Sequence, residues 1–443
     1  MKYKKFLYSK KAQIAVWGTG FIGLSTMAYF AKRKVKCIGY DISEKKVNTI
    51  NKGKLPLPEL KNWFGFDIKN LVSRKYLKAT NNYKELINKN TIVHFVAIPT
   101  EKKGKPFFDI LFDVLRKIIE IKKIKCHLKP VVIIESTLTP QFSEKKIIPF
   151  FNKHNIKVGQ NLLYAVAPRR DWFVEGTKSL SDLDRVFGST DTKSSKIVRE
   201  ILSIVCNKLH EASSHKVSEM VKSVENSYRH MEITLANQLS LAYPNEDMRE
   251  VLALVGTKWN IGTYYPGFGT GGYCIPLSSQ YVLNEIKDNS KLTLLRETIK
   301  TDNEINIIIA KSLISRGFKK IGVLGLSYKG NLRVSILSPI IPFVKELVKN
   351  KIDVEIYDPF FSRNEINDIL GIKMFKFPQD IKKFDCLVIS VDHDKFKINK
   401  NQIKKYVKNC KFILDNNGIW KNYKLNKFGL NYHVAGDKNW LKF

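Results

Sequence analysis

The chain has 443 residues and a mass of 51.1 kDa, which exceeds one compact core of ordinary size and predicts two or three domains. A hydrophobic share of 44% and an aromatic share of 11% indicate a globular rather than a disordered protein, and the absence of any run of eighteen apolar residues excludes a transmembrane helix. The net charge of +35 comes from lysines spread along the whole chain. A nucleic-acid binder should cluster them with aromatic residues on one element, so we expect only a positive field that attracts anionic small ligands.

The N-terminal part of the chain alternates between predicted strands and helices. A buried strand at Ile14–Trp17, a glycine turn, a helix at Phe21–Lys32 and a strand at Lys36–Tyr40 form one strand–helix–strand unit. The alternation continues through a strand, a helix and a strand at 91–97, 110–121 and 131–135. Such alternation predicts a parallel sheet with helices on both faces.

The pattern becomes helical between residues 211 and 315. The stretch Ser218–Ala242 has apolar residues at helical spacing and contains no Pro or Gly, which predicts a long helix that ends before Pro244. A glycine-rich loop at Gly262–Pro276 follows, and Leu283–Leu313 is expected to be helical again.

A second alternation of strands and helices begins near Lys319. We predict a helix at Ile341–Lys349 and strands at Ile321–Leu324, Val354–Tyr357, Cys386–Val391 and Lys411–Leu414. The predicted fold class is α/β, with two Rossmann-like doubly wound parallel-sheet domains joined by a central helical domain that contains one long helix. We place the three domains at residues 1–210, 211–315 and 316–443.

The cysteine pattern argues against disulfides and metal. The six cysteines are scattered, and none forms a C-x-x-C pair, so neither a disulfide framework nor a zinc site is indicated. The start of the chain has no apolar stretch that resembles a secretory signal. We therefore expect a cytoplasmic protein without a metal site.

The first motif is a dinucleotide-binding fingerprint, Gly18-Thr19-Gly20-Phe21-Ile22-Gly23, between a predicted strand and a predicted helix. Gly18 allows the tight turn, Gly20 lets a pyrophosphate approach the backbone, and Gly23 lets the helix pack closely on the strand. Asp41 lies 23 residues after Gly18, at the end of the second strand. A carboxylate there binds the ribose hydroxyls and favours NAD over NADP. The alternative is a glycine turn that binds nothing.

Two further motifs carry reactive side chains. Four glycines in six positions, Gly267 to Gly272, precede Cys274, and a thiol in such a loop is either structural or a nucleophile. Lys222 and Asn226 are four residues apart, so the predicted long helix places them on one face. Taken alone, this lysine would be read as an ordinary exposed residue.

In this order, the three motifs resemble those of the nucleotide-sugar 6-dehydrogenases, such as UDP-glucose and UDP-N-acetylmannosamine dehydrogenases. The resemblance covers nearly the whole chain, including the segments 96–100, 135–137, 219–237 and 325–330. It implies an N-terminal NAD domain, a central helical domain that forms a homodimer, and a C-terminal UDP-binding domain. It further implies that the C6 alcohol of a UDP-sugar is oxidised to the carboxylate by two NAD, through a thiohemiacetal and a thioester on Cys274. The product would feed surface polysaccharide synthesis.

The resemblance also implies site residues. The catalytic residues would be Cys274, Lys222, Asn226, Thr137 and Glu175. The NAD-binding residues would be Gly18, Gly20, Phe21, Ile22, Gly23, Asp41, Lys46, Thr100 and Thr137. The residues that bind the nucleotide sugar would be Lys222, Asn226, Tyr264, Gly267, Gly271, Lys329 and Arg333. Among these roles, Lys222 and Asn226 would stabilise an oxyanion on the sugar oxygen.

Departures from the family pattern surround the predicted sugar pocket. Ser278 stands where the family usually carries an Asp four residues after the cysteine, and Arg169 stands where a substrate-contacting Glu is common. Glu175 matches a thioester-hydrolysing Glu only if two residues are inserted, and Asn260 occupies the place of an Arg that reaches the partner's UDP in some members. We interpret these changes as altered sugar specificity or an altered proton path. Arg169 and the next residue, Arg170, would suit an anionic sugar, or either could bind pyrophosphate or lie on the surface.

Three other readings compete with this one. The first is a nucleotide-sugar-binding protein that lacks efficient thioester hydrolysis; Ser278 supports it, and the retained Cys274 and Lys222 argue against it. The second is a nucleic-acid-associated protein on a Rossmann scaffold. The third is a hydroxyacid dehydrogenase, which would need neither the Cys274 loop nor the second Rossmann-like domain.

Overall fold

A computed structural model describes residues 2–57, 60–102, 104–171, 179–284, 286 and 288–441. By its internal contacts the chain divides into two compact units. The N-terminal unit comprises residues 1–225 with 284–286, and the C-terminal unit comprises residues 226–283 with 287–443. The predicted domain boundaries at 210 and 315 stay predictions.

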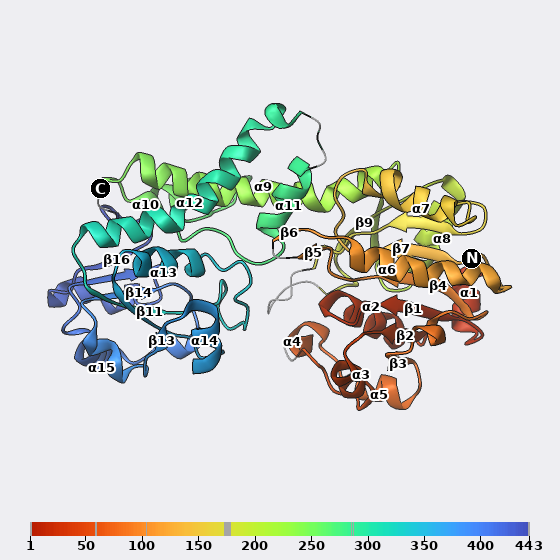
Figure 1. The fold of residues 1–443 in the computed structure, drawn as a ribbon, viewed down its shortest axis with the longest axis horizontal. Helices are drawn as coiled ribbons and strands as arrows, with labels where there is room; N and C mark the ends of the chain where they lie inside the picture. Colours follow the sequence, from red (N-terminus) through yellow and green to blue (C-terminus); the bar gives the residue numbers. More distant parts are fainter. Residues whose placement is uncertain are drawn as a thin grey trace. The chain divides into compact units, whose positions relative to one another are not determined.

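The N-terminal unit is built on one eight-stranded sheet (Figure 1). Its strands, in sheet order, are β10 (Lys208–Glu211), β9 (Asp184–Ser189), β8 (Leu163–Val166), β7 (Val131–Ile134), β4 (Thr91–Val96), β1 (Gln13–Trp17), β2 (Lys36–Tyr40) and β3 (Leu77–Thr80). Every neighbouring pair is parallel except β8 and β9. A small separate hairpin pairs β5 (Glu101–Lys102) with β6 (Lys105–Pro106).

Helices cover both faces of this sheet because its strands are apolar on both sides. In β1, Ile14 and Val16 pack into one core, whereas Ala15 and Trp17 pack into the core on the opposite face. The helices of this unit are α1 (Lys2–Tyr8), α2 (Phe21–Lys32), α3 (Glu44–Asn51), α4 (Leu60–Phe64), α5 (Lys69–Ser73), α6 (Asp109–Ile118), α7 (Ile148–Lys153) and α8 (Thr192–Leu202).

The C-terminal unit contains a six-stranded, all-parallel sheet. Its strands, in sheet order, are β13 (Lys373–Met374), β12 (Asp353–Tyr357), β11 (Lys320–Leu324), β14 (Cys386–Ile389), β15 (Phe412–Asp415) and β16 (Tyr432–Val434). The helices of this unit are α10 (Met248–Val255), α11 (Ile275–Asn284), α12 (Thr293–Ser315), α13 (Ile340–Lys349), α14 (Arg363–Leu370) and α15 (Lys400–Val407). In both sheets the order reverses beside the first strand, which confirms the predicted α/β fold class with two Rossmann-like sheets.

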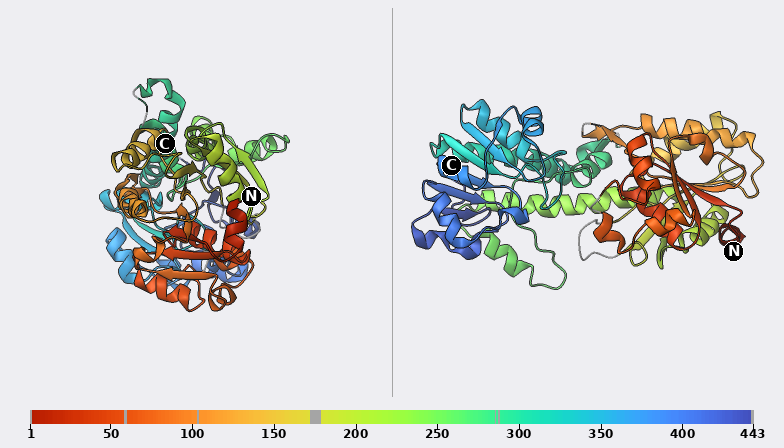
Figure 2. Two further views of the ribbon diagram at one scale, coloured as in Figure 1. Left: turned by 90° about the vertical axis from the view of Figure 1, so that its right-hand side faces the viewer. Right: turned by 90° about the horizontal axis from the view of Figure 1, so that it is seen from below.

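The long helix α9 (His215–Ala242) is continuous and contributes to both units (Figure 2). Its first turns are tied to the N-terminal unit, where Ser218 Oγ donates to Val166 O at 2.8 Å and Glu219 Oε1 accepts from Ser143 N at 2.9 Å. The predicted long helix is confirmed, with its end at Ala242 just before Pro244.

The helical stretch predicted at Leu283–Leu313 is confirmed from Thr293 onward, where α12 runs to Ser315, but it is not continuous with α11. Helix α11 ends at Asn284 and α12 begins at Thr293. Between them, Asp288 Oδ1 accepts a hydrogen bond from Ser290 N at 3.0 Å. Short polar side chains that bond to nearby backbone in this way compete with the helical hydrogen-bond pattern.

Within the described ranges, no helix combines the length and the apolarity needed to cross a membrane. The same part of the chain holds no group of three His, Cys, Asp or Glu side chains arranged as metal ligands would be.

Candidate active site

The glycine turn after β1 has the shape that a dinucleotide pyrophosphate requires. Gly18 has a φ of +90°, and a side chain there would meet the carbonyl oxygen of Ala97 at 2.5 Å. A Cβ at Gly23 would overlap the carbonyl oxygen of Gly18, whereas one at Gly20 would meet nothing within 4 Å. No side chain caps the N-terminus of α2, so its first backbone N–H groups can receive an anion. The predicted residues Phe21 and Ile22 form the first turn of this helix.

Asp41 lies directly after β2 and is hydrogen-bonded to the glycine turn. Its Oδ2 accepts from Thr19 N at 3.1 Å and from Thr19 Oγ1 at 2.8 Å, and its Oδ1 accepts from Ser43 N at 3.0 Å. Lys46 Nζ lies 3.6 Å from Asp41 Oδ2. Each carboxylate oxygen has more than one acceptor site, so the arrangement fits a ribose hydroxyl at Asp41 as well as the turn that it holds.

The segments that follow β4 and β7 meet at the same edge of the sheet. Ser136 Oγ accepts from Ile98 N at 2.9 Å, and Thr100 Oγ1 donates to the carbonyl of Thr137 at 2.6 Å. Thr100 and Thr137 are thus brought together, beyond the carboxyl ends of neighbouring parallel strands. That edge is where doubly wound sheets bind their ligands.

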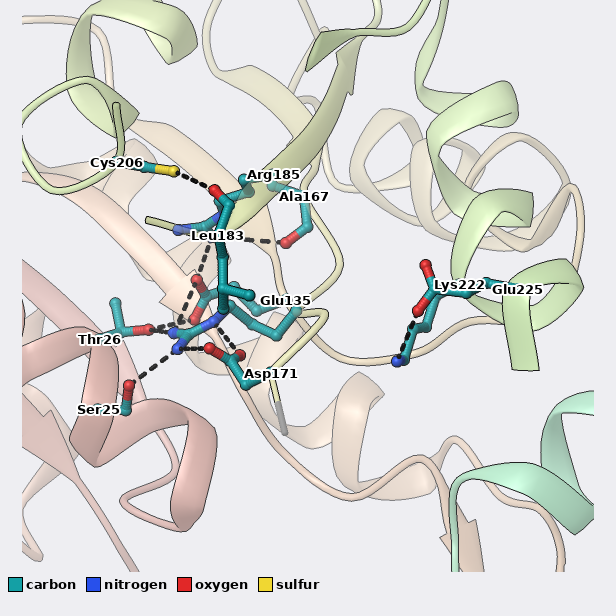
Figure 3. A network of polar contacts seen from close by, with 11 residues as sticks. Ser25, Thr26, Glu135, Ala167, Asp171, Leu183, Arg185, Cys206, Lys222 and Glu225 are labelled. Atoms are coloured by element: carbon teal, nitrogen blue, oxygen red, sulfur yellow. Dashed lines mark hydrogen bonds and ion pairs between the residues drawn. The ribbon is translucent and has the colours of Figure 1, made fainter. Parts of the chain in front are cut away.

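A buried network of four charged side chains lies near the carboxyl ends of β7 and β8 (Figure 3). Arg169 donates to both oxygens of Asp171, with Nε–Oδ2 at 2.6 Å and Nη2–Oδ1 at 2.9 Å. Glu135 lies 3.7 Å from Arg169 Nη1 and also accepts from Arg185. Two arginines and two carboxylates leave the network formally neutral, which reduces the cost of burying the charges.

The same network reaches the cofactor helix α2. Arg169 donates to Ser25 Oγ at 2.8 Å and to Thr26 Oγ1 at 2.5 Å, and Thr26 Oγ1 donates to Glu135 Oε2 at 2.7 Å. The network therefore joins α2 to the ends of β7 and β8.

The interpretation of Arg169 and Arg170 as extra positive charges for an anionic sugar is wrong. Arg169 is buried, and Asp171 and Glu135 neutralise it. Arg170 Nε pairs with Glu225 Oε2 at 2.6 Å, and Lys222 Nζ lies 3.4 Å from the other oxygen of the same carboxylate. Asp171 was missed because its role depends on a partner two residues away that sequence reasoning had placed in the sugar pocket. Glu175 lies outside the described residues.

Cys274 is exposed and directly precedes α11 in the C-terminal unit. Its carbonyl oxygen accepts from Ser278 Oγ at 2.6 Å and from Asn226 Nδ2 at 3.2 Å. Asn226 Nδ2 also donates to Ser278 Oγ at 2.9 Å. Ser278 therefore fixes the first turn of α11. Both amide hydrogens of Asn226 are engaged as well, and its predicted role as an oxyanion donor stays a prediction.

The glycines before Cys274 are required by close packing. A Cβ at Gly271 would overlap the side chain of Tyr328, and one at Gly272 would meet its ring at 2.7 Å. Burial raises the pKa of the Tyr328 hydroxyl, and the electrostatic interaction with Cys274 raises it further. Tyr328 thus belongs to the surroundings of the thiol. It stands in the segment 325–330 that the sequence singled out, but no spacing rule linked it to Cys274.

Two cationic side chains, Lys329 and Arg229, interact with each other electrostatically. Burial lowers the pKa of the Lys329 ammonium; Asp392 opposes this shift and Arg229 adds to it. Arg229 also interacts with Tyr264, as does Glu232, so the predicted residues Lys329 and Tyr264 have Arg229 as a common neighbour. Sequence reasoning missed Arg229, although it lies three residues after Asn226 on the same helix.

Arg333 pairs with neighbouring residues of its own unit, and its predicted role in nucleotide binding stays a prediction. Its guanidinium pairs with Glu365, and its Nε donates to the carbonyl of Phe360 at 3.0 Å. The side chain is thus committed to the connection between β12 and α14.

The turn after β11 is held by a second carboxylate. Asp358 Oδ2 accepts from Leu326 N at 2.8 Å, from Ser327 N at 3.0 Å and from His393 Nε2 at 3.1 Å. His393 Nδ1 must be an acceptor, because Asn331 N donates to it at 2.8 Å. Burial alone would raise the pKa of Asp358, but the hydrogen bonds from His393 and Ser327 outweigh it and hold the pKa below its usual value.

Comparison with known proteins assigns three stretches of the chain to one family. The models for the NAD-binding, central and UDP-binding domains of the UDP-glucose/GDP-mannose dehydrogenase family match residues 12–205, 216–304 and 322–422. The chain belongs to this family. It is an NAD-dependent UDP-sugar dehydrogenase, which confirms the resemblance seen in the sequence and the prediction of NAD as the cofactor.

Named relatives agree with this assignment. The chain is 28% identical to Protein CapL of Staphylococcus aureus, over 93% of this chain and 97% of that protein. It is 27% identical to UDP-N-acetyl-D-mannosamine dehydrogenase of Methanococcus aeolicus, over 100% and 99%. The solved structure of the UDP-D-ManNAc dehydrogenase of Pyrococcus horikoshii matches with a TM-score of 0.82 and 26% identity, over 96% of this chain and 100% of that one.

The two later glycines of the fingerprint should separate fold from cofactor binding. Gly23→Ala pushes a methyl group into the Gly18 carbonyl, so it should lower both the melting temperature and the affinity for NAD. Gly20→Ala meets no protein atom and should change the melting temperature by less than about 2 °C. It should still weaken NAD binding at least about tenfold, which corresponds to ~1.4 kcal/mol. Calorimetric titration and thermal unfolding measure both effects. Unchanged NAD affinity in Gly20→Ala would contradict a pyrophosphate at this turn.

The buried network should dominate the stability of the N-terminal unit. Arg169→Met leaves Asp171 without its bidentate partner, and breaking such a buried pair should lower the free energy of unfolding by about 3–5 kcal/mol. The exposed pair of Arg199 and Glu211 offers a control, since Arg199→Met should cost less than about 1 kcal/mol. Urea denaturation followed by circular dichroism compares the two. Equal losses in both variants would refute the assignment.

Proposed function

We propose that this dehydrogenase oxidises the C6 alcohol of a UDP-sugar to the carboxylate, with covalent intermediates on Cys274, and that the product serves surface polysaccharide synthesis. The observation that carries the proposal is the exposed Cys274 at the start of α11, in a loop whose glycines pack against Tyr328. The relatives named UDP-N-acetyl-D-mannosamine dehydrogenase make UDP-N-acetyl-D-mannosamine the first substrate to test.

Cys274 has the setting that a nucleophile needs. It is the exposed cysteine of the described part of the chain, and burial raises the pKa of the thiols of Cys37, Cys206, Cys386 and Cys410. An exposed thiol is accessible to a bound substrate, so Cys274 is the cysteine placed to attack the carbonyl carbon of an aldehyde.

The chemistry balances as two oxidations and one hydrolysis. The alcohol first becomes an aldehyde, and the Cys274 sulfur forms a C–S bond to its carbon. Oxidation of this thiohemiacetal gives a thioester, and water then breaks the C–S bond to release the carboxylate and the thiol. NAD, when bound, supplies the acceptor for the hydride lost in each oxidation.

Other residues take positioning and proton-transfer roles in the proposal. Asn226 holds the Cys274 carbonyl through its Nδ2, and we assign oxyanion stabilisation to Lys222, whose ammonium lies 3.4 Å from Glu225. Thr137, whose carbonyl accepts a hydrogen bond from Thr100, helps to position NAD at the carboxyl edge of the N-terminal sheet. Because Ser278 is tied to the Cys274 carbonyl, proton transfer falls to Lys222, Glu175 or water. Lys329 and Tyr264 would bind the UDP-sugar together with Arg229.

One observation favours the second candidate, a nucleotide-sugar-binding protein with inefficient hydrolysis. The hydroxyl of Ser278 occupies the place where a carboxylate could act as a base, and it donates to backbone instead. A slow last step would then leave the thioester on Cys274. The two candidates differ in whether free carboxylate is released.

We also propose a homodimer through the central helices. Apolar side chains on α9, on α10 and in the segment after α10 are exposed, with Leu254 at 65% and Trp259 at 91%. The others in this group are Tyr228, Leu235, Val251, Val255 and Ile261. Large apolar side chains exposed on neighbouring elements of the chain are typical of an interaction site. A cytoplasmic location stays a prediction.

Replacement of the thiol tests the mechanism. Cys274→Ser should lower carboxylate formation at least about 100-fold, because a hydroxyl is a much poorer nucleophile near neutral pH. Cys126→Ser is the matched control, since Cys126 is partly buried and distant in sequence, and it should keep wild-type activity. NADH release and product mass are measured over a panel of UDP-sugars that starts with UDP-N-acetyl-D-mannosamine.

Intact-protein mass spectrometry after rapid acid quench distinguishes the two candidates. Turnover with a transient adduct on Cys274 supports the dehydrogenase, whereas a stable adduct without carboxylate release supports the binding protein. A Cys274→Ser variant that forms carboxylate at the wild-type rate would exclude covalent catalysis.

The dimer is tested by charge on its proposed surface. Trp259→Glu or Leu254→Glu should convert a dimer into monomers, because a carboxylate at the centre of an apolar interface loses its hydration. Val348→Glu, at an exposed apolar residue of α13, is the control and should not alter the mass. Light scattering after gel filtration gives the mass directly. A dimer that persists in both test variants would place the interface elsewhere.

A further inference from the structure

Asp302 of α12 binds the part of the glycine loop that precedes Cys274 in the sequence. Asp302 Oδ1 accepts from Thr270 N at 2.8 Å, and Asp302 Oδ2 accepts from Thr270 Oγ1 at 2.6 Å. Gly269 has a φ of +99°, and a side chain there would meet Asp302 Oδ1 at 2.9 Å. A single carboxylate therefore receives both hydrogens that Thr270 can donate.

His230 of α9 extends this contact to the side after the thiol. Its ring is 1% exposed, with Nε2 at 3.2 Å from Asp302 Oδ2 and Nδ1 at 2.9 Å from Ser279 Oγ. Ser279 Oγ in turn lies 3.4 Å from Ser227 Oγ. Asp302 and His230 thus connect Thr270, four residues before Cys274, with Ser279, five residues after it.

This pair differs from the contacts already assigned to the site. Asn226 bonds the Cys274 carbonyl itself, and Asn237 Oδ1 accepts from Gly267 N at 2.8 Å at the start of the loop. These bonds come from α9 alone. Asp302 adds α12 as a second support, and His230 joins the two helices.

Burying a carboxylate and an imidazole costs free energy that well-packed apolar residues would not. Here the buried pair contacts the loop at Thr270 and the first turns of α11 at Ser279. The two hydrogen bonds that Thr270 donates to Asp302 are directional, so they restrain the backbone of the loop, and His230 Nε2 lies in close contact with the same carboxylate. Reacting groups held within a fraction of an ångström gain rate, and a small misplacement loses it.

We propose that Asp302 and His230 are positioning residues that hold the Cys274 loop in its reactive geometry. The inference rests on the proposed catalytic role of Cys274. Neither residue is expected to touch the substrate or NAD.

Paired variants test the proposal. Asp302→Asn keeps the shape and removes the charge, and Glu304→Gln makes the same chemical change at an exposed residue of α12. Thr270→Val removes the hydroxyl that Asp302 receives, whereas Thr270→Ser keeps it. His230→Asn keeps a hydrogen-bonding group near the position of Nδ1, and His230→Ala keeps none. Each variant is measured for kcat, for KM of NAD and for hydrogen exchange of the peptide around Thr270.

Asp302→Asn, Thr270→Val and His230→Ala should each lower kcat about tenfold or more, with the KM of NAD within about twofold of wild type, because the NAD site lies in the N-terminal unit. The Thr270 peptide should exchange at least about five times faster. Glu304→Gln and Thr270→Ser should resemble wild type, and His230→Asn should regain part of the loss.

Two results would overturn the proposal: unchanged loop exchange in Asp302→Asn and Thr270→Val, or faster exchange with kcat unchanged. If Asp302→Asn fails to fold, Thr270→Val and Thr270→Ser decide alone. An active Cys274→Ser enzyme would refute the proposed function, and loop exchange would still show whether Asp302 holds the loop.

Discussion

In both sheets, a carboxylate directly after the second strand accepts hydrogen bonds from the turn that follows the first strand. Asp41 accepts the N–H of Thr19, and Asp358 accepts those of Leu326 and Ser327. Adjacent parallel strands end at one edge, so the turn after one strand must meet the first residue after its neighbour. The backbone N–H groups of that turn need acceptors. The carboxylate satisfies them and shapes the edge where a nucleotide binds.

The buried charged side chains of this strongly basic chain pair with one another. The interior network of Arg169, Asp171, Glu135 and Arg185 is neutral and hydrogen-bonded to α2. Lys329 and Arg229 are likewise accompanied by two carboxylates, since Asp392 acts on Lys329 and Glu232 acts on Tyr264 beside Arg229. At Arg169, where the sequence departs from the family pattern, the structure shows buried charge pairing with Asp171 and Glu135.

Features that depend only on neighbouring residues could be predicted from the sequence. The fingerprint turn, the long helix and the glycine loop were predicted correctly, because φ, helical spacing and chain order decide them. The sequence did not suffice for roles that depend on partners far along the chain. Arg169 contacts Thr26, 143 residues away, and Asp302 contacts Thr270, 32 residues away. A residue type shows what a side chain can bond, but only the fold shows which partner it has.

Because α9 is continuous, the sequence distance between two of its residues sets both their separation along the axis and the angle between their side chains. From Lys222 to Asn237 the helix advances by about 22 Å and each residue turns by about 100°. One face of this uninterrupted helix therefore carries four of the residues discussed above: Lys222, Asn226, His230 and Asn237. One residue gained or lost within this span would rotate every later contact away from the cysteine loop at once. A substitution within this span changes one contact, whereas a change of length alters the direction of every residue after it.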